Sequence, residues 1–209
     1  MLVMFREFFS RQARKPSGLF GRLLAARIFD KGNAALNRHM ISLVDASGSD
    51  RILEIGFGTG QALDRMAASL TDGVAEGIDF SEAMLKVAGQ RNRHHISAGR
   101  VKLTLGDFGG AAYGQESFDT VCSTNTIYFW PEPEATMDAI FDVLKPGGAL
   151  VLGFVAKERM DTMPLSTDVF RSYSPDEVLA LAEGAGFTRS EVHDVHGHAY
   201  GEYCIKAFK

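Results

Sequence analysis

The sequence predicts an α/β fold: a doubly wound, seven-stranded sheet that is mostly parallel, with an antiparallel final strand and helices on both faces. Three observations lead to this prediction. From residue 49 onward, short β-type runs alternate with helical segments, which is typical of strands paired in parallel. A glycine-rich turn joins the first run to the first helix. The last two runs are separated only by a short loop at 196–201, so they must pair antiparallel.

Each predicted strand is a short apolar or β-branched run that ends at a turn. The first is RILEI at 51–55, and the apolar run at 149–154 follows the helix-breaking Lys145-Pro146-Gly147-Gly148. The expected strands are 51–55, 74–78, 101–105, 118–123, 149–154, 187–195 and 202–208.

Capping residues mark two of the predicted helices. Ser81 is placed to cap a helix over 82–92. The run Ser174-Pro175-Asp176-Glu177 combines a cap residue, proline at the first helical position and glutamate three residues after the cap, and it opens a helix that ends near Ala185. Further helices are expected at 61–70 and 133–144, and within 1–40, where Pro16-Ser17-Gly18 is a break.

Length and composition are those of a globular protein. The 209 residues are 45% hydrophobic and 23% charged, and we expect an N-terminal helical arm at 1–48 and a main domain at 49–209. No apolar run approaches the roughly 18 residues that span a bilayer. The two cysteines, Cys122 and Cys204, do not suggest a disulfide framework. A cytoplasmic protein is therefore expected.

Charge is distributed unevenly along the chain. Residues 1–40 hold eight Lys or Arg against two acidic residues, a net charge of +6, whereas the remainder holds 14 against 24, a net of −10. The acidic main body is a poor match for nucleic acid, so no nucleic-acid partner is expected. The basic arm also carries Phe5, Phe8, Phe9 and Phe20, so two alternatives stay open for it: it packs on the acidic body, or it lies against an anionic membrane.

The stretch ILEIGFGTGQ at 52–61 predicts a ligand site. In a doubly wound sheet, ligands bind beyond the carboxyl ends of the strands, where this stretch places Gly56, Gly58 and Gly60. A dinucleotide fingerprint would need a third glycine at Gln61. The spacing here is G-x-G-x-G, and Glu54 precedes it, which suits a cationic ligand group better than a pyrophosphate.

Two more carboxylates end the neighbouring strands. Asp79, in GIDF, is placed to accept hydrogen bonds from both hydroxyls of a ribose. Asp107, in LGDF, is placed to accept from an exocyclic amine of adenine. Phe80 and Phe108 could flank the base, or they could be ordinary core residues.

These motifs resemble those of the class I S-adenosylmethionine-dependent methyltransferases, in particular the small members that act on metabolites or lipids, which have a Rossmann-like fold. LEIGFGTG, GIDFSEAML, LGDF, FDTVCSTNTIYFW and LKPGGALVLGF occur in the family's order over about 49–154. The resemblance implies that S-adenosyl-L-methionine is the cofactor, that Glu54 and the run from Gly56 to Gly60 hold its methionine end, and that Asp79 binds its ribose. Asp107 and Phe108 would then meet its adenine.

The resemblance also implies where the methyl acceptor binds. Asn125 follows the fourth strand and should lie near the sulfonium and the acceptor, with Tyr128 and Trp130 as walls of the acceptor pocket, unless these rings only pack under the next helix. His39 is a further catalytic candidate, because N-terminal helices often cover the cofactor in this family. The irregular segment 157–173 suggests a lid or an acceptor wall. No metal site is expected: we interpret His193, His196 and His198 as residues of a strand and its turn.

The expected reaction is methyl transfer to a small-molecule acceptor, which could be a phospholipid or an amine. The alternative of an RNA or protein methyltransferase is disfavoured, because Thr124-Asn125-Thr126-Ile127 departs from the proline-rich motif of the variants that methylate planar nitrogens. A nucleotide-binding oxidoreductase, or a catalytically silent domain that only binds the cofactor, is the third alternative. The sequence does not decide the acceptor atom.

Overall fold

A computed structural model describes residues 7, 10–12, 14–16, 32–195 and 201–209. Most of the N-terminal arm lies outside these residues, including the phenylalanines at 5, 8, 9 and 20, and so do His196 and His198. The predictions that rest on them are therefore not addressed by the structure.

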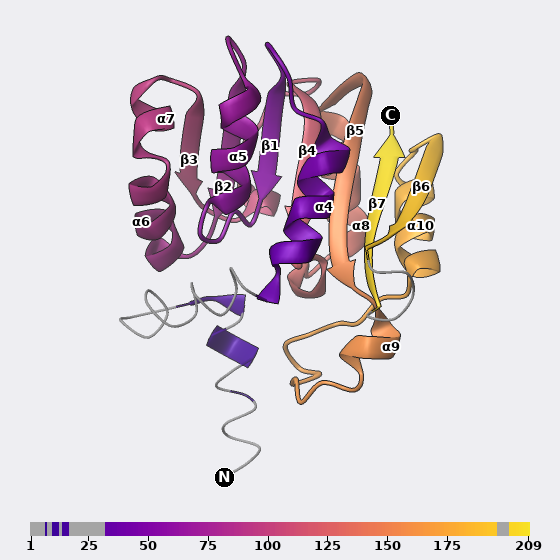
Figure 1. Ribbon diagram of the computed structural model, residues 1–209. Helices are drawn as coiled ribbons and strands as arrows, with labels where there is room; N and C mark the ends of the chain where they lie inside the picture. The colour runs from indigo at the N-terminus through magenta and orange to yellow at the C-terminus, as the bar shows by residue number, and fades with distance from the viewer. Residues whose placement is uncertain (1–6, 8–9, 13, 17–31, 196–200) are drawn as a thin grey trace.

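The sheet has the predicted seven strands, in the order β3-β2-β1-β4-β5-β7-β6 (Figure 1). Strands β1 to β5 pair in parallel, and β7 pairs antiparallel with both β5 and β6. The predicted fold class is confirmed. The strands are β1 Arg51–Ile55, β2 Val74–Asp79, β3 Val101–Leu105, β4 Phe118–Thr124, β5 Leu144–Val155, β6 Arg189–Asp194 and β7 Glu202–Phe208.

Helices cover both faces of the sheet (Figure 1). On one face α4 crosses β4, β5 and β7, while α5 and α6 pack over β2 and β3 and α7 adjoins α5 and α6. On the other face α8 packs on β5, and α10 packs on β6 and β7. The described α-helices are α4 Ala34–Val44, α5 Gln61–Ser69, α6 Glu82–Arg91, α7 Arg93–Ser97, α8 Pro133–Val143, α9 Lys157–Met160 and α10 Pro175–Gly184.

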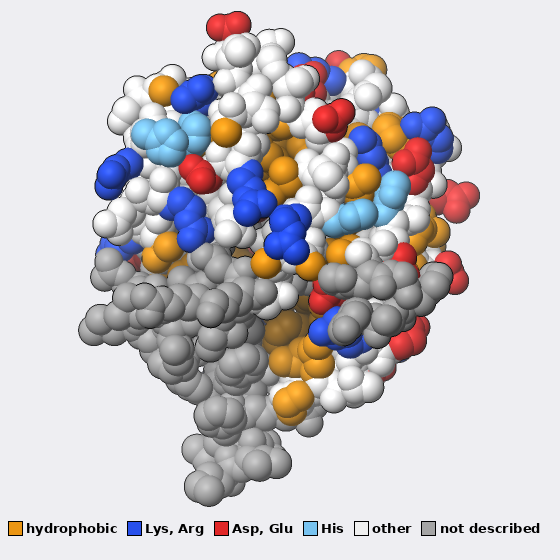
Figure 2. Space-filling model, in the orientation of Figure 1, with side chains coloured by type: hydrophobic (Ala, Val, Ile, Leu, Met, Phe, Trp, Pro, Cys, Tyr) orange, Lys and Arg blue, Asp and Glu red, His pale blue; other side chains and the backbone are white. Residues whose placement is uncertain are grey.

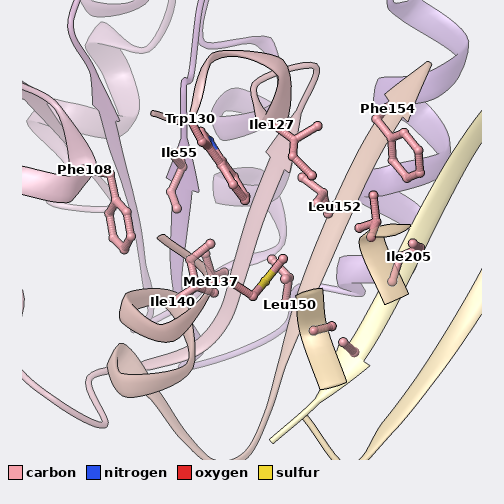
Figure 3. Packing of buried hydrophobic residues seen from close by; sticks show 14 of the residues in the cluster. Ile55, Phe108, Ile127, Trp130, Met137, Ile140, Leu150, Leu152, Phe154 and Ile205 are labelled. Carbon is pink, nitrogen blue, oxygen red and sulfur yellow. The ribbon is translucent and has the colours of Figure 1, made fainter. Parts of the chain in front are cut away.

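Strand alternation divides the core between the two faces. Successive side chains of a strand point to opposite faces, so Ile52 packs with the cluster beneath α4 and α5, while Leu53 packs with the cluster beneath α8 and α10. Figure 3 shows Met137 of α8 and Leu150 of β5 pointing toward one another in the second cluster. Each such fully buried side chain contributes about 1.5–3 kcal/mol to folding.

The helix α4 belongs to this core although it lies within the expected arm. Its residues Leu36, Met40 and Val44 recur at helical spacing and are buried in the cluster beneath α4 and α5. The helix therefore packs on the main sheet, and its Asn37 lines a cavity at the end of the sheet.

Both predicted helix caps are confirmed. The Ser81 hydroxyl accepts a hydrogen bond from the Met84 amide at the start of α6. At the start of α10, the Ser174 hydroxyl accepts from the Glu177 amide (3.2 Å) while the Ser174 amide donates to the Glu177 carboxylate (2.8 Å), a complete capping box.

The predicted start of the fifth strand was wrong. A helix to residue 144 and a strand from residue 149 were expected, but the helix ends at Val143 and β5 begins at Leu144, which pairs with Phe118 of β4. The register then shifts before Thr120 pairs with Ala149, so the breaker residues between them bulge from the strand. Gly147, with φ +78°, supplies the left-handed backbone that this bulge requires.

Among the helices that the structure describes, none is both long enough and apolar enough to span a membrane.

Candidate functional site

A cavity of about 350 Å³ opens at the carboxyl ends of β1 to β4. The strand order reverses between β1 and β4, and a doubly wound sheet binds ligands at such a point. The glycine turn after β1, the ends of β2 and β4, and the segment after β5 all contribute lining residues. They include Glu54, Gly56, Gly58, Asp79, Phe80, Asp107, Phe108, Asn125, Tyr128, Phe129, Trp130, Met160, Met163 and Phe170, together with Asn33 and Asn37 of the α4 region.

The glycines of the turn after β1 have different roles. Gly56, Gly58 and Gly60 all have positive φ, which favours glycine at each position. Gly58 lines the cavity, and a Cβ atom there would meet no protein atom within 4 Å. At Gly56 a Cβ atom would lie 2.4 Å from the Thr126 side chain. Gly58 therefore leaves the backbone open to a ligand in the cavity, whereas Gly56 makes room for the Thr126 side chain.

Gly60 does not line the cavity, although the sequence placed it with the cofactor. A Cβ atom at this position would lie 2.5 Å from Asn92 Nδ2 and 2.8 Å from the Ala88 Cβ atom. Asn92 also donates a hydrogen bond from Nδ2 to the Gly60 carbonyl (3.0 Å). Gly60 thus lets α5 and α6 pack closely beneath the turn.

Asp79 holds the turn and still faces the cavity. Its Oδ2 accepts a hydrogen bond from the Gly58 amide (2.9 Å), and its Oδ1 accepts from the Ser81 amide (2.8 Å). Each carboxylate oxygen can accept a further bond, so two hydroxyl groups of a ligand can be bound side by side. Burial raises the pKa of this carboxyl, while the two amides and Lys15 act to lower it.

Glu54 is a buried carboxylate at the end of β1. Burial, and secondly the charge of Asp79, raise its pKa well above the ordinary value, although the Leu63 amide donates a hydrogen bond to it and acts to lower it. Its Oε2 is buried and has no hydrogen-bond partner among the described residues. An unpartnered buried carboxylate oxygen is unfavourable, so this end of the cavity is suited to a cationic group.

Asp107 and the two phenylalanines form the third side of the cavity. Asp107 ends the turn after β3, where its Oδ1 accepts from the Gly109 amide (3.1 Å). The buried Phe108 ring stacks 6.0 Å from Tyr113, and Phe80 lines the cavity with Lys15 Nζ 5.6 Å from its ring centroid. The structure therefore brings together Glu54, Asp79 and Asp107 with both rings.

Asn125 is held in a strained conformation at the edge of the cavity. Its φ of +58° is left-handed, which is uncommon for a residue other than glycine. Its backbone N–H donates to the Gly153 carbonyl (2.8 Å). In the side chain, Nδ2 donates to Asn33 Oδ1 (3.0 Å) and Oδ1 accepts from the Tyr128 hydroxyl (2.8 Å). The side chain is thus fixed from both ends.

The Tyr128 hydroxyl is engaged in structure rather than free for proton transfer. It accepts a hydrogen bond from the Val155 amide (2.5 Å) and donates to Asn125. Burial raises the pKa of Tyr128 far above its ordinary value, so the phenol stays protonated at neutral pH. It positions Asn125 while its ring lines the cavity.

An apolar wall faces the Asn125 side of the cavity. The ring centroids of Phe129 and Phe170 lie 4.8 Å apart, and that of Tyr128 lies 5.8 Å from Phe170. Met160 and Met163 complete this wall. Segment 157–173, which the sequence suggested as a lid or acceptor wall, therefore lines the cavity.

The structure does not bring His39 to this cavity. Asn33 and Asn37 lie one turn apart and line it, whereas His39 is not among the lining residues. Its ring centroid lies 5.9 Å from that of His193 on β6, at the far edge of the sheet. The helix turns by about 100° per residue, so a side chain two positions after Asn37 points to another side.

Sequence reasoning missed three polar residues of the site. Asn33 and Asn37 have the i, i+4 spacing of one helix face, a signal that could have identified them. Thr124 lines the cavity with a buried hydroxyl that has no partner among the described residues. No local pattern distinguishes it from other strand-end threonines.

The residues present fit S-adenosyl-L-methionine. The unpartnered Oε2 of Glu54 suits the ammonium of an amino acid, and the paired acceptors of Asp79 suit vicinal hydroxyls. Phe80 and Phe108 offer apolar surface beside Asp107. The volume of about 350 Å³ lies within the range of small-molecule sites.

Comparison with known proteins gives consistent results. Residues 52–148 match the family model described as "Methyltransferase domain". The chain is 30% identical to the uncharacterized methyltransferase YdaC of Bacillus subtilis (strain 168), over 79% of this chain and 86% of that protein. It is also 30% identical to a demethylmenaquinone methyltransferase of Clavibacter sepedonicus, over 71% of this chain and 61% of that protein.

A solved structure has the same fold. The chain superposes on a SAM dependent methyltransferase from Aquifex aeolicus with a TM-score of 0.69 and 20% identity, over 87% of this chain and 94% of that one.

Proposed function

Because the chain belongs to the class I S-adenosylmethionine-dependent methyltransferases and uses S-adenosyl-L-methionine as its cofactor, we propose that it methylates a small molecule with an apolar body. The observation that carries this proposal is the composition of the cavity. Of its described lining residues, the carboxylates Glu54, Asp79 and Asp107 come from β1, β2 and the turn after β3, whereas the wall beyond Asn125 is aromatic and methionine-rich. A polar cofactor and an apolar acceptor can therefore meet beside Asn125.

The residue assignments follow from the same geometry. Glu54 would hold the ammonium of the cofactor, Asp79 its ribose hydroxyls, and Asp107 with Phe108 its adenine. Asn125 would orient the reacting groups, since both ends of its amide are fixed by Asn33 and Tyr128.

When bound, the cofactor would supply a methyl group bonded to a sulfonium; an acceptor nucleophile would bond to the methyl carbon in line with the carbon–sulfur bond, and the neutral thioether would leave. The protein then mainly aligns the acceptor and excludes water, and such orientation can supply roughly 7–11 kcal/mol of the barrier. Phe129, Phe170 and Met163 would exclude water, and Tyr128 would act through Asn125 rather than as a base. An acceptor that is already nucleophilic fits this site best.

Among the relatives, the demethylmenaquinone methyltransferase is named for an apolar quinone. This name supports a small, largely apolar acceptor for the present chain. A phospholipid or an amine remains within the proposal, because aromatic rings also attract a methylammonium group, by about 1–2 kcal/mol when it is desolvated.

We also propose that the N-terminal arm covers the cofactor site. The Ser81 hydroxyl donates to the Pro16 carbonyl (2.7 Å) on one rim of the cavity, and the Ser166 amide donates to the Ser10 hydroxyl (3.0 Å) on the other.

Contact of the arm with an anionic membrane is the competing proposal. Sedimentation of the full chain with anionic vesicles distinguishes them: the cover proposal predicts no binding.

Untargeted profiling with an isotopically labelled methyl donor tests the proposed function. Extracts are incubated with the full chain, and labelled products are compared with those formed by Asp79→Ala. The proposal predicts a labelled apolar metabolite that the variant does not produce. Label incorporated only into RNA or protein would contradict it.

A further inference from the structure

A second group of ligand-type side chains lies outside the cavity. Asp64 of α5 and the adjacent His94 and His95 of α7 place one potential ligand atom each within 4.8 Å of one another. None of the three lines the cofactor cavity. Figure 2 shows histidine side chains on the surface over α7, with an acidic side chain beside them.

The two imidazoles converge on one carboxylate oxygen. The Nε2 atoms of His95 and His94 lie 3.4 Å and 3.9 Å from Asp64 Oδ1. Both separations exceed the 2.7–3.2 Å of an ordinary N–H···O hydrogen bond. The His95 separation matches the roughly 3.4 Å that two ligands have when each lies about 2.1 Å from a tetrahedral zinc ion, and a small rotation of the His94 side chain would bring its nitrogen to the same separation.

Packing fixes part of the group in place. The His95 side chain is only 5% exposed, whereas His94 is 61% exposed and Asp64 37% exposed. A buried ligand is held by its surroundings, and two more accessible ligands leave a path for an ion and for a water in the fourth position. The rings of His94 and His95 lie 3.8 Å apart between centroids.

From this geometry we propose that Asp64, His94 and His95 form a divalent transition-metal site, with Zn²⁺ as its ion. Imidazole and carboxylate ligands suit Zn²⁺ and neighbouring first-row ions better than Mg²⁺ or Ca²⁺. The site joins α5 to α7 beside the cofactor turn: Asp64 lies in the first turn of α5, and Asn92, just before α7, donates to the Gly60 carbonyl. A bound ion would clamp these two helices together.

Calorimetric titration with Zn²⁺ tests the site. The tag-free full chain is stripped with chelator, desalted and titrated beside His94→Ala, Asp64→Asn and the control His193→Ala. His94 is exposed and Asp64 is only half-buried, so their replacement should preserve the fold, and thermal unfolding of each variant checks this. His193 lies on β6, outside the group, with its Nε2 3.3 Å from Glu191 and its ring 5.9 Å from that of His39.

The proposal predicts one Zn²⁺ per wild-type chain, bound at least about tenfold more weakly by His94→Ala and Asp64→Asn. The affinity of His193→Ala for Zn²⁺ should lie within about twofold of the wild-type affinity. Zn²⁺ should raise the melting temperature of the wild type and of His193→Ala, but not that of His94→Ala or Asp64→Asn. Absence of wild-type binding, unchanged affinity in both ligand variants, or an equal loss in His193→Ala would overturn it.

Discussion

At the scale of single residues, the proposed binding role of Glu54 comes with a cost to the stability of the ligand-free protein. Its pKa is raised by burial and by Asp79, so the folded state holds its proton more tightly than the unfolded chain. Stability therefore falls as pH rises above the ordinary carboxyl pKa of 4.5. Asp79 contributes in the same direction. A cation bound beside Glu54 would offset this penalty.

We expect Glu54→Gln to raise the melting temperature of the ligand-free protein at pH 7, by roughly 2–4 °C for each kcal/mol gained. It should also flatten the decline of stability between pH 5 and pH 7. Affinity for S-adenosylhomocysteine should fall by about 1.5–3 kcal/mol, because a charged hydrogen bond is lost. Thermal unfolding measures the two effects on stability, and calorimetry measures the affinity. Glu183→Gln, at an exposed position, is the control. A lower melting temperature together with unchanged affinity would contradict the assignment.

Asn125 offers a separate test of backbone strain. Asn125→Gly and Asn125→Ala both remove the bonds to Asn33 and Tyr128, but only alanine must place a Cβ atom at φ +58°. We expect both variants to unfold at lower denaturant concentration, with alanine less stable than glycine by about 1–2 kcal/mol. Equal stability of the two would show that the left-handed conformation is absent in solution.

The site residues differ in how far the sequence could predict them. Glu54, Asp79 and Asp107 were predictable because each lies at or just beyond the end of a recognisable strand, and parallel strands end at one edge of the sheet. Gly60 was assigned to the cofactor because spacing alone does not show which side of a turn is packed. His39 was placed near the acceptor because its helix was expected to cover the site, but the rotation of that helix depends on tertiary packing.

At the scale of elements, Gly60 sets the distance between α5 and α6. We expect Gly60→Ala to lower the free energy of unfolding through two effects: left-handed strain of about 1 kcal/mol, and overlap with Asn92 and Ala88 of about 1–3 kcal/mol. Gly99→Ala is the matched control, because φ is +73° there and a Cβ atom would meet nothing within 4 Å. Denaturant unfolding should show that Gly99→Ala lowers the free energy of unfolding less than Gly60→Ala does. An equal decrease in the two variants would contradict the packing role of Gly60.

Strands and long helices were predicted within a few residues, because periodicity and capping residues act locally. The start of β5 was not predicted correctly, because Leu144 joins the sheet only through its pairing with Phe118, before the bulge. The short helices α7 and α9 were also missed. With so few residues, their stability depends on neighbouring elements rather than on their own sequence.

At the scale of the whole molecule, the described parts of the arm reach both rims of the cavity. Lys15 lies over Phe80, and Ser10 contacts Ser166. If the arm covers the bound cofactor, S-adenosylhomocysteine should slow trypsin cleavage after Arg11 and Arg14 severalfold, whereas NAD should not. Mass spectrometry of timed digests measures this. Equal cleavage rates with and without S-adenosylhomocysteine would place the arm elsewhere.

A crystal structure of the full chain with S-adenosylhomocysteine tests the central claim most directly. The account predicts its amino group beside Glu54, its ribose hydroxyls on Asp79 and its adenine between Asp107 and Phe108, with the sulfur facing Asn125. Binding of this compound at any other place on the molecule, or in this cavity without contact to Asp79, would contradict it.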